Sequence, residues 1–250
     1  MSLLWRNREL RIGLAPERVY VSGASSLDLP AGDGGWAAAL EALPGILKGR
    51  NGAASVVLAD QLVRYALLPH NETLKSDEQW AALARHRFSV LHGPRVEEWE
   101  VRVARTAPSG VRLACAVDKA LLSQMCEIFQ KAGVKLATVQ PFLVAAFNRI
   151  RRRVGNGSCW IVVEEPGRLT LALVQRGAWV AIRARRSDAQ WRKVLGEILE
   201  RESAFLGLSQ PVTRVIVCAQ GELDVAHFIE EHQQWRTEAL SYRELALSKE

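Results

Sequence analysis

The segment LRIGLAPERVYVSG (residues 10–23) places two apolar runs on either side of a short turn, Ala15-Pro16-Glu17-Arg18. Valine, isoleucine and tyrosine are common in strands, and proline is common in turns because its ring fixes φ. We therefore predict two strands, at 10–15 and 18–23, that pair as a hairpin.

The same pattern returns in the second half of the chain. Residues 159–185, CWIVVEEPGRLTLALVQRGAWVAIRAR, predict three strands with turns at Glu165-Pro166-Gly167 and Gln175-Arg176-Gly177. A long amphipathic helix is expected next, and its apolar face would comprise Trp191, Val194, Leu195, Ile198, Leu199, Phe205 and Leu206. Because strands in hairpin order precede a helix in both halves, we expect an α/β protein of two similar lobes with a cleft between them.

The region between the two hairpins carries alternating helix and strand signals. Strands are expected at 54–70 (on either side of Ala59-Asp60-Gln61), 98–105, 110–118 and 134–140, and helices at 36–47, 76–93, 119–133 and 141–150. Pro44 should bend or end the first of these helices. The apolar face of the 76–93 helix would comprise Trp80, Leu83, Ala84, Phe88 and Leu91. Near the C-terminus, a strand at 212–219, a turn at Gln220-Gly221 and a helix at 224–235 are expected.

The domain boundaries follow from this order. The stretch GNGS (155–158) is the best linker candidate. We predict a first lobe at 1–75 and 119–154, an inserted subdomain at 76–118, and a second lobe at 155–250.

Composition sets the broad class. The 250 residues are 48% hydrophobic and 24% charged, which is typical of globular proteins. No apolar run approaches the roughly 20 residues that span a bilayer, and the N-terminus does not have the pattern of a signal peptide. The four cysteines, Cys115, Cys126, Cys159 and Cys218, lack the paired spacing of a zinc site and each lies in an apolar run, so we expect buried free thiols.

The chain is basic, with a net charge of +6 and a pI near 9.4. This favours an acidic partner, an anionic membrane surface or nucleic acid. Arginines cluster at 148–155 and 182–188, without the interleaved exposed aromatic residues of a single-strand binder. We therefore expect no nucleic-acid partner, and part of the first cluster is explained by favourable placement of cations at a helix C-terminus.

The polar residues form no catalytic or metal-binding motif. His86 with His92, and His227 with His232, lack the spacing of a zinc-binding helix and are expected to be solvated or hydrogen-bonded. Asp60 and Asp118 are isolated in the sequence and are predicted to cap turns or helices. No nucleophile elbow and no Walker-type phosphate loop is present.

Three stretches carry a resemblance to a known family. VVLADQLVRYALLPH, EIFQKAGVKLATVQPFLVAAFNRI and the repeated hairpins after Cys159 resemble the actin-like superfamily over about residues 9 to 240. The order of elements in the inserted segment is similar to that of the division protein FtsA and, more closely, to the pilus assembly protein PilM, the cytoplasmic domain of the type II secretion protein GspL and the MshI proteins. The resemblance implies ribonuclease H-like duplicated lobes with an inserted α-β-β-α subdomain.

Actin-like proteins that bind ATP carry aspartate and glycine in two hairpin turns and a glycine-rich third element. At the corresponding positions this chain has Ala15-Pro16-Glu17, Glu165-Pro166-Gly167 and Gln220-Gly221-Glu222. Proline removes a backbone N–H donor from the first turn, and the carboxylates of Glu164 and Glu165 would repel a phosphate. We therefore expect no cofactor, no metal and no enzymatic activity, and we retain an actin-like ATP-binding protein or ATPase with unusual turns as the alternative.

The resemblance also implies partners. It predicts a cytoplasmic scaffold, peripheral to the inner membrane, in the assembly platform of a type IV pilus or a type II secretion-like system. Such a scaffold links the cytoplasmic tail of a PilN-like single-pass membrane protein to the hexameric assembly ATPase, and self-association stays open. The expected tail contact comprises Arg85, Arg87, Arg102 and Arg105, with the cluster Arg151 to Arg153 as the alternative.

Overall fold

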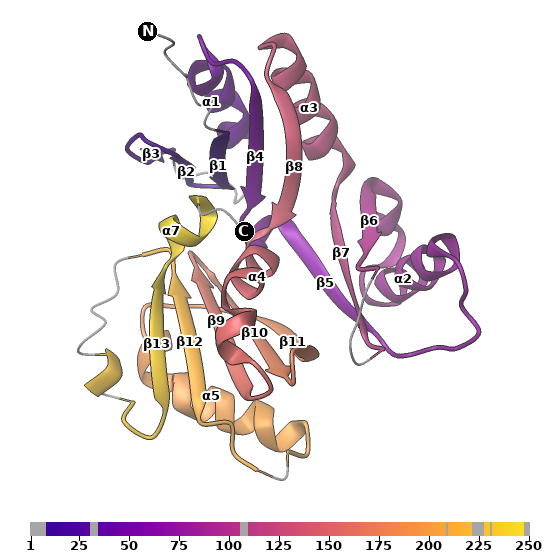
Figure 1. Cartoon of the computed structure of the whole chain (residues 1–250), viewed down its shortest axis with the longest axis vertical. Helices are drawn as coiled ribbons and strands as arrows, with labels where there is room; N and C mark the ends of the chain where they lie inside the picture. The colour runs from indigo at the N-terminus through magenta and orange to yellow at the C-terminus, as the bar shows by residue number, and fades with distance from the viewer. Residues whose placement is uncertain are drawn as a thin grey trace, which may run out of the picture.

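The computed structural model describes residues 9–30, 35–105, 110–208, 210–221, 228–230 and 232–247. Two five-stranded mixed sheets form its two halves, and a smaller three-stranded sheet lies beside them (Figure 1). The first sheet has the strand order β3-β2-β1-β4-β8, with β1 Leu10–Ala15, β2 Arg18–Val21, β3 Leu27–Asp28, β4 Ala53–Leu58 and β8 Lys135–Pro141. The second has the order β11-β10-β9-β12-β13, with β9 Ser158–Glu165, β10 Arg168–Gln175, β11 Ala178–Arg186, β12 Arg214–Ala219 and β13 Arg236–Ser241.

The two sheets repeat one topology. In each, the first strand pairs antiparallel with the second and parallel with the fourth, and the fifth strand lies parallel beyond the fourth. Helix α1 (Ala37–Leu47) connects the third and fourth strands of the first sheet, and α5 (Trp191–Phe205) occupies the same place in the second. This confirms the duplicated α/β lobes expected from the repeated hairpins.

Two helices fill the space between the sheets. Helix α4 (Phe142–Val154) follows β8, and helix α7 (Tyr242–Leu247) follows β13. Both belong to one buried cluster that also takes in Tyr20 and Val57 of the first sheet and several residues of β9, β10 and β12. Figure 1 shows α4 and α7 between the two sheets. The lobes therefore share a continuous apolar core rather than being joined only by a linker.

The three-stranded sheet has the order β5-β7-β6, with β5 Val63–Leu68, β6 Trp99–Val103 and β7 Arg112–Asp118. Helix α2 (Asp77–His92) packs on one face of it through Trp80, Ala84 and Phe88. Helix α3 (Lys119–Lys131) returns the chain to the core of the first lobe. Because β5 pairs with β7, this sheet includes residues 63–68, which precede the subdomain predicted at 76–118. The domain boundaries given from the sequence stay a prediction.

Local signals explain how these helices begin and end. Helix α2 starts with a capping box in which Ser76 and Gln79 bond each other's backbone. Gly93 and Gly133 follow α2 and α3 with positive φ, a conformation that costs glycine little. Among the described helices, none is long and apolar enough to cross a membrane.

Several expectations need correction. Of the two effects expected of Pro44, to bend or to end α1, the second does not occur, because the helix continues to Leu47 with Leu43 and Leu47 buried in the core. Leu91, Val194 and Phe205 were expected on apolar helix faces but are exposed, since each lies off the stripe that its helix buries. Cys126 is likewise exposed, beside the buried Met125.

The C-terminal region was only partly foreseen. The helix expected at 224–235 is seen at 228–230, while 222–227 and 231 lie outside the described residues. Strand β13 and helix α7 were not predicted, because RTEALS has too few apolar residues to signal a strand. Both elements nevertheless complete the second lobe and its contact with the first.

Candidate functional site

A buried carboxylate joins the two lobes at the end of β9. Glu165 accepts hydrogen bonds from the backbone N–H groups of Asp60 and Gln61, each at 2.8 Å, and from the Tyr242 hydroxyl at 2.6 Å. Asp60 begins the short 3₁₀ helix η1 (Asp60–Leu62) directly after β4 of the first lobe. A side chain of the second lobe therefore caps a helical turn of the first.

Asp60 extends this connection to α4 and to the three-stranded sheet. Its Oδ1 accepts from the backbone N–H of Leu143 at 3.0 Å, in the first turn of α4, and from the hydroxyl of Tyr65 on β5. Its Oδ2 is buried and has no hydrogen-bond partner among the described residues. The predicted capping role of Asp60 is confirmed, and although Asp60 is isolated in the sequence, the fold brings Glu165 beside it. Asp118 caps α3 by accepting from Ala120 N at 2.8 Å.

The electrostatics of this pair follow from its burial. Burial raises the pKa of both the Asp60 and the Glu165 carboxyls, and the neighbouring charge of Asp60 raises the pKa of Glu165 further. Two adjacent buried carboxylates do not both ionise readily, so the pair shares a proton near neutral pH. The pKa of Glu165 is raised further than that of Asp60, to about 8 against about 6, because the charge of Asp60 adds to the effect of burial.

The three turns that differ from those of ATP-binding relatives lie at the ends of β1, β9 and β12. Ala15, Pro16 and Glu17 join β1 to β2, and Glu165, Pro166 and Gly167 join β9 to β10. Gln220 and Gly221 follow β12 and line a hollow of about 360 Å³ with Arg18, Tyr20 and Tyr242. Glu222 lies outside the described residues. Because Glu165 already bonds the amides of Asp60 and Gln61, those donors are not available to a phosphate.

Three of the four histidines considered in the sequence lie in the described part of the chain. His86 and His92 are exposed at α2, and His232 is buried with its Nδ1 at 2.9 Å from the Phe228 carbonyl oxygen. His227 lies outside the described residues. Within the described part of the chain, no three His, Cys, Asp or Glu side chains are grouped to hold a metal ion.

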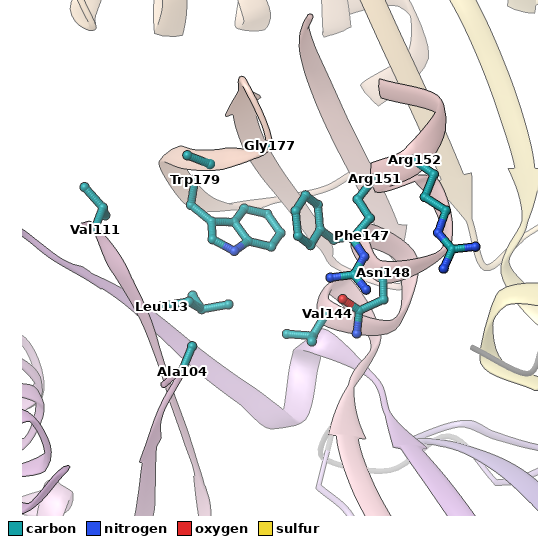
Figure 2. Close-up of a pocket in the computed structure, with 11 residues that line it drawn as sticks. Ala104, Val111, Leu113, Val144, Phe147, Asn148, Arg151, Arg152, Gly177 and Trp179 are labelled. Atoms are coloured by element: carbon teal, nitrogen blue, oxygen red, sulfur yellow. The ribbon is translucent and has the colours of Figure 1, made fainter. Parts of the chain in front are cut away.

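A groove lies between the three-stranded sheet, α4 and the β10–β11 turn, and we call it the Trp179 groove. Its volume is about 870 Å³. It is lined by Ala104, Val111, Leu113, Val144, Phe147, Asn148, Arg151, Arg152, Gly177, Ala178 and Trp179. Figure 2 shows the rings of Phe147 and Trp179 facing each other, with centroids 4.4 Å apart, and Val111, Leu113 and Ala104 across the opening from α4. The groove thus combines apolar walls with two arginines.

A second hollow of about 900 Å³ continues beyond Trp179. It shares Val111, Ala178 and Trp179 with the Trp179 groove and reaches Leu208 and Pro211 of the second lobe. The tryptophan therefore stands between two hollows along one surface.

The arginines expected to bind a partner do not line this groove. Arg85 and Arg87 are exposed on α2, which packs on the sheet face that carries Ala114 and Ala116. The neighbouring Leu113 lines the groove and so points from the opposite face. Arg102 pairs with Glu100 at 2.9 Å, and Arg105 pairs with Asp77 at 3.2 Å.

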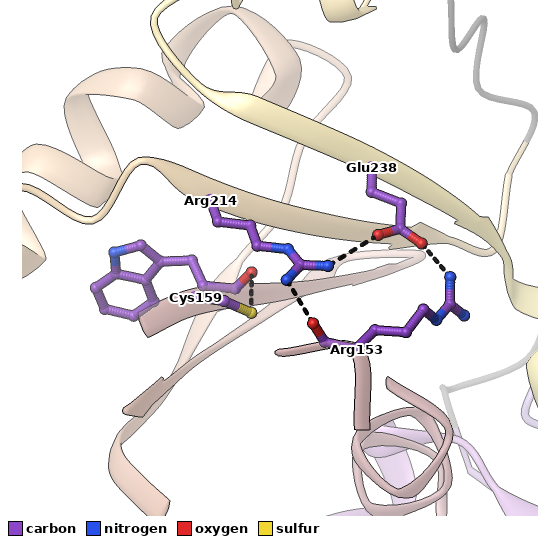
Figure 3. A network of polar contacts seen from close by, with 5 residues as sticks. Arg153, Cys159, Arg214 and Glu238 are labelled. Atoms are coloured by element: carbon purple, nitrogen blue, oxygen red, sulfur yellow. Dashed lines mark hydrogen bonds and ion pairs between the residues drawn. The ribbon is translucent and has the colours of Figure 1, made fainter. Parts of the chain in front are cut away.

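The alternative cluster, Arg151 to Arg153, is divided. Arg151 and Arg152 are exposed and line the Trp179 groove, whereas Arg153 turns away to pair with Glu238 on β13. Arg214 bonds the other oxygen of Glu238 at 3.4 Å and the Arg153 carbonyl at 2.9 Å (Figure 3). Arg153 therefore anchors the end of α4 to the second sheet. Sequence reasoning missed Phe147 and Trp179, since their only signal was an aromatic residue in each of two distant segments.

We predict that Glu165→Ala strongly destabilises the fold. The change leaves two buried N–H groups and the Tyr242 hydroxyl without their acceptor, and each such loss costs about 1–3 kcal/mol. The free energy of unfolding, measured by urea denaturation, should fall by about 3 kcal/mol or more. The control Glu200→Ala removes an exposed carboxylate from α5 and should change it by less than about 0.5 kcal/mol. Equal effects of the two substitutions would contradict the bridging role.

The carboxyl pair also predicts a pH dependence. Because both pKa values are raised in the folded chain, folding takes up protons, and the pair's contribution is complete below about pH 4 and is lost as pH rises. Asp60→Asn retains an acceptor for Leu143 N but cannot ionise. The stability of the wild type minus that of the variant should therefore fall from about pH 4 to pH 8, by up to about 1.4 kcal/mol per pH unit. A difference that is constant across this range in urea titrations would show that folding does not raise the pKa of Asp60.

Comparison with known proteins supports the assignment of the fold. No family model and no curated protein sequence matches the chain. Among solved structures, it is similar to the PilM-PilN type IV pilus biogenesis complex, with a TM-score of 0.67, 13% identity and coverage of 95% of this chain and 89% of that chain. It is also similar to a Bacteroides thetaiotaomicron protein of unknown function with an actin-like ATPase fold, with a TM-score of 0.60 and 14% identity. That match covers 93% of this chain and 90% of the other.

The cytoplasmic domain of EpsL, an inner membrane component of the type II secretion system of Vibrio cholerae, gives a TM-score of 0.53 at 15% identity. That match covers 95% of this chain and 92% of the other. The expected resemblance to PilM and to the cytoplasmic GspL-type domain is therefore confirmed over nearly the whole chain. The chain has the actin-like fold, with duplicated mixed sheets.

Proposed function

We propose that this protein is a non-enzymatic scaffold that binds the cytoplasmic tail of a PilN-like single-pass inner-membrane protein in the Trp179 groove. The groove is the observation that carries the proposal, because it is open, long enough to continue past Trp179, and walled by the three-stranded sheet and both lobes. The similarity to PilM, solved with PilN, supports a partner of this kind.

The chemistry of the groove suits an extended peptide. Aliphatic side chains of the tail would pack on Phe147, Trp179 and Leu113, where apolar surface leaves water. Arg151 and Arg152 would attract acidic residues at the rim of the groove, and such charges mainly set the association rate and its salt dependence. We therefore expect a tail with aliphatic anchors beside acidic residues.

The scaffold would act at the cytoplasmic face of the inner membrane, in the platform of a type IV pilus or a type II secretion-like system. Its second partner would be the hexameric assembly ATPase, so that the tail and the ATPase are held by one rigid body. The similarity to the cytoplasmic domain of EpsL supports this location. The continuous core between the lobes supports the rigidity that such a link requires.

We expect Arg151→Glu with Arg152→Glu to abolish capture of the tail without unfolding the chain, because both side chains are exposed. The tagged chain is expressed in its native host, membranes are solubilised in mild detergent, and captured proteins are identified by mass spectrometry. A single-pass membrane protein should accompany the wild type. Its cytoplasmic tail, made as a peptide, should bind the variant at least tenfold more weakly in calorimetry, consistent with the loss of a charged rim.

The matched control is Arg85→Glu with Arg102→Glu, which reverses the same number of exposed charges away from the groove. We expect it to retain capture at an unchanged melting temperature. If this control loses capture while the groove variant keeps it, the tail binds at the expected α2 and β6 arginines instead. Capture of no membrane protein by the wild type would contradict the scaffold proposal.

The competing function is ATP binding in the hollow beside Gln220 and Gly221. We expect Mg-ATP to leave the melting temperature unchanged and to be hydrolysed at no measurable rate, because Pro16 removes a backbone N–H donor from the first turn and the turns lack the aspartates of ATP-binding relatives. A ligand at 100 times its dissociation constant stabilises a protein by about 2.7 kcal/mol, which a thermal scan resolves easily. An ATP-binding actin-like protein serves as the positive control. A stabilisation that EDTA abolishes would favour the ATPase alternative.

A further inference from the structure

The C-terminal end of α2 exposes two adjacent aliphatic side chains. Val90 is 67% exposed and Leu91 is 59% exposed, whereas the same helix buries Trp80, Ala84 and Phe88 against the three-stranded sheet. Neither exposed side chain contributes to that core. Val90 and Leu91 therefore form a small exposed apolar patch at the end of the helix.

Arginines surround this pair. Arg87 lies three and four residues before Val90 and Leu91, on the same side of the helix, and Arg95 follows in the short helix η2 (Gly93–Glu98). Both arginines are exposed, and within the described part of the chain neither has a carboxylate within 4 Å. Their charges are therefore available to an external anion.

A third arginine, Arg64, lies near the C-terminal end of α2 and is less exposed than Arg87 and Arg95. Arg64, on β5, is half-buried and stands over the ring of Trp99, 5.3 Å from its centroid, and the same ring meets His92 at 5.1 Å. Burial lowers the pKa of the Arg64 guanidinium; the positive charges of Arg168 and Arg95 lower it further, while Asp118 raises it. Positive charge is thus crowded here, and a bound anion would relieve it.

Acidic groups are also present nearby. Glu97 and Glu98 end η2 and are exposed, and Asp118 faces Arg64 from the end of β7. The exposed Lys119 adds a cation, with its Nζ at 2.7 Å from the Glu97 carbonyl oxygen. These acids reduce the local positive charge without pairing with Arg87 or Arg95. Neutralising them should therefore strengthen the attraction of an anion to this surface.

We propose that this end of α2 docks on an anionic lipid bilayer. In the docked state Val90 and Leu91 enter the interfacial layer, and Arg87, Arg95 and Arg64 face the phosphates of the head groups. We call these five residues the α2 tip. Basic side chains near an anionic leaflet and apolar side chains at the acyl boundary add their contributions in such contacts.

A bilayer fits the α2 tip better than a protein partner does. A stable protein interface buries about 800 Å² on each side, usually around aromatic anchors, whereas this tip offers two aliphatic side chains beside exposed cations. Small apolar insertions combined with dispersed charge are sufficient at a fluid anionic surface. The tip lies on the face of the three-stranded sheet away from the Trp179 groove, so lipid and tail would not compete.

The test is sedimentation of the purified full chain with vesicles, in the absence of any partner. We expect binding to vesicles of phosphatidylcholine mixed with phosphatidylglycerol, and little binding to phosphatidylcholine alone. Arg87→Gln with Arg95→Gln should lower the partition coefficient about thirtyfold at low ionic strength, from the usual contribution of a cation at an anionic leaflet. Val90→Ser with Leu91→Ser should lower it about tenfold or more. Glu97→Gln with Glu98→Gln should raise it.

Matched controls lie on α5 of the second lobe. Phe205→Ser removes a side chain that is 78% exposed, and Lys193→Gln with Arg201→Gln removes two exposed cations. Both variants should bind vesicles as the wild type does. If the α5 cations matter as much as those of the α2 tip, or if Val90→Ser with Leu91→Ser has no effect, binding reflects only the overall basic charge and the proposal is wrong.

Failure to bind anionic vesicles would also overturn the proposal. If, in addition, the α2 tip substitutions released a protein from the host membrane fraction, the occupant would be a protein instead. Because no membrane protein is present in the vesicle assay, its outcome does not depend on capture of a tail by the Trp179 groove. The two proposals therefore fail independently.

Discussion

The carboxylate of Glu165 is the contact on which the arrangement of the lobes depends. It belongs to β9 of the second sheet, yet two of its three hydrogen bonds come from the backbone that follows β4 of the first. Asp60, one of those donors, in turn caps α4 and accepts from Tyr65. One buried pair thus ties together both large sheets, the helix between them and the inserted sheet.

This pair also explains why a groove forms beside α4. Asp60 holds the first turn of the helix, and the pairing of Arg153 with Glu238 holds its last turn against β13. With both ends held, the side of α4 that carries Phe147 is presented to Trp179, and that contact forms the wall of the groove. The groove is therefore a consequence of how the lobes are joined rather than of any one segment.

The limits of sequence reasoning follow from the same geometry. The repeated hairpins and the capping box of α2 were predictable, since alternation and capping act within a few residues. The meeting of Asp60 with Glu165 was not, because about 100 residues separate them and neither position alone differs from a turn carboxylate. Pro44 lies within α1, where burial of Leu43 and Leu47 outweighs the local cost of a proline in a helix.

Joining two lobes through a buried carboxyl pair costs free energy, because desolvation opposes each charge. An apolar contact of the same volume would give equal or greater stability, so the advantage of the pair lies in geometric specificity. Glu165 satisfies two particular amides and one hydroxyl, and a different angle between the lobes would leave these donors buried and unpaired. Because the amides that follow β4 are bonded by the chain's own Glu165, the angle between the lobes is set by a contact within the chain. Such a body is suited to presenting two surfaces at a constant separation, as the proposed scaffold role would require.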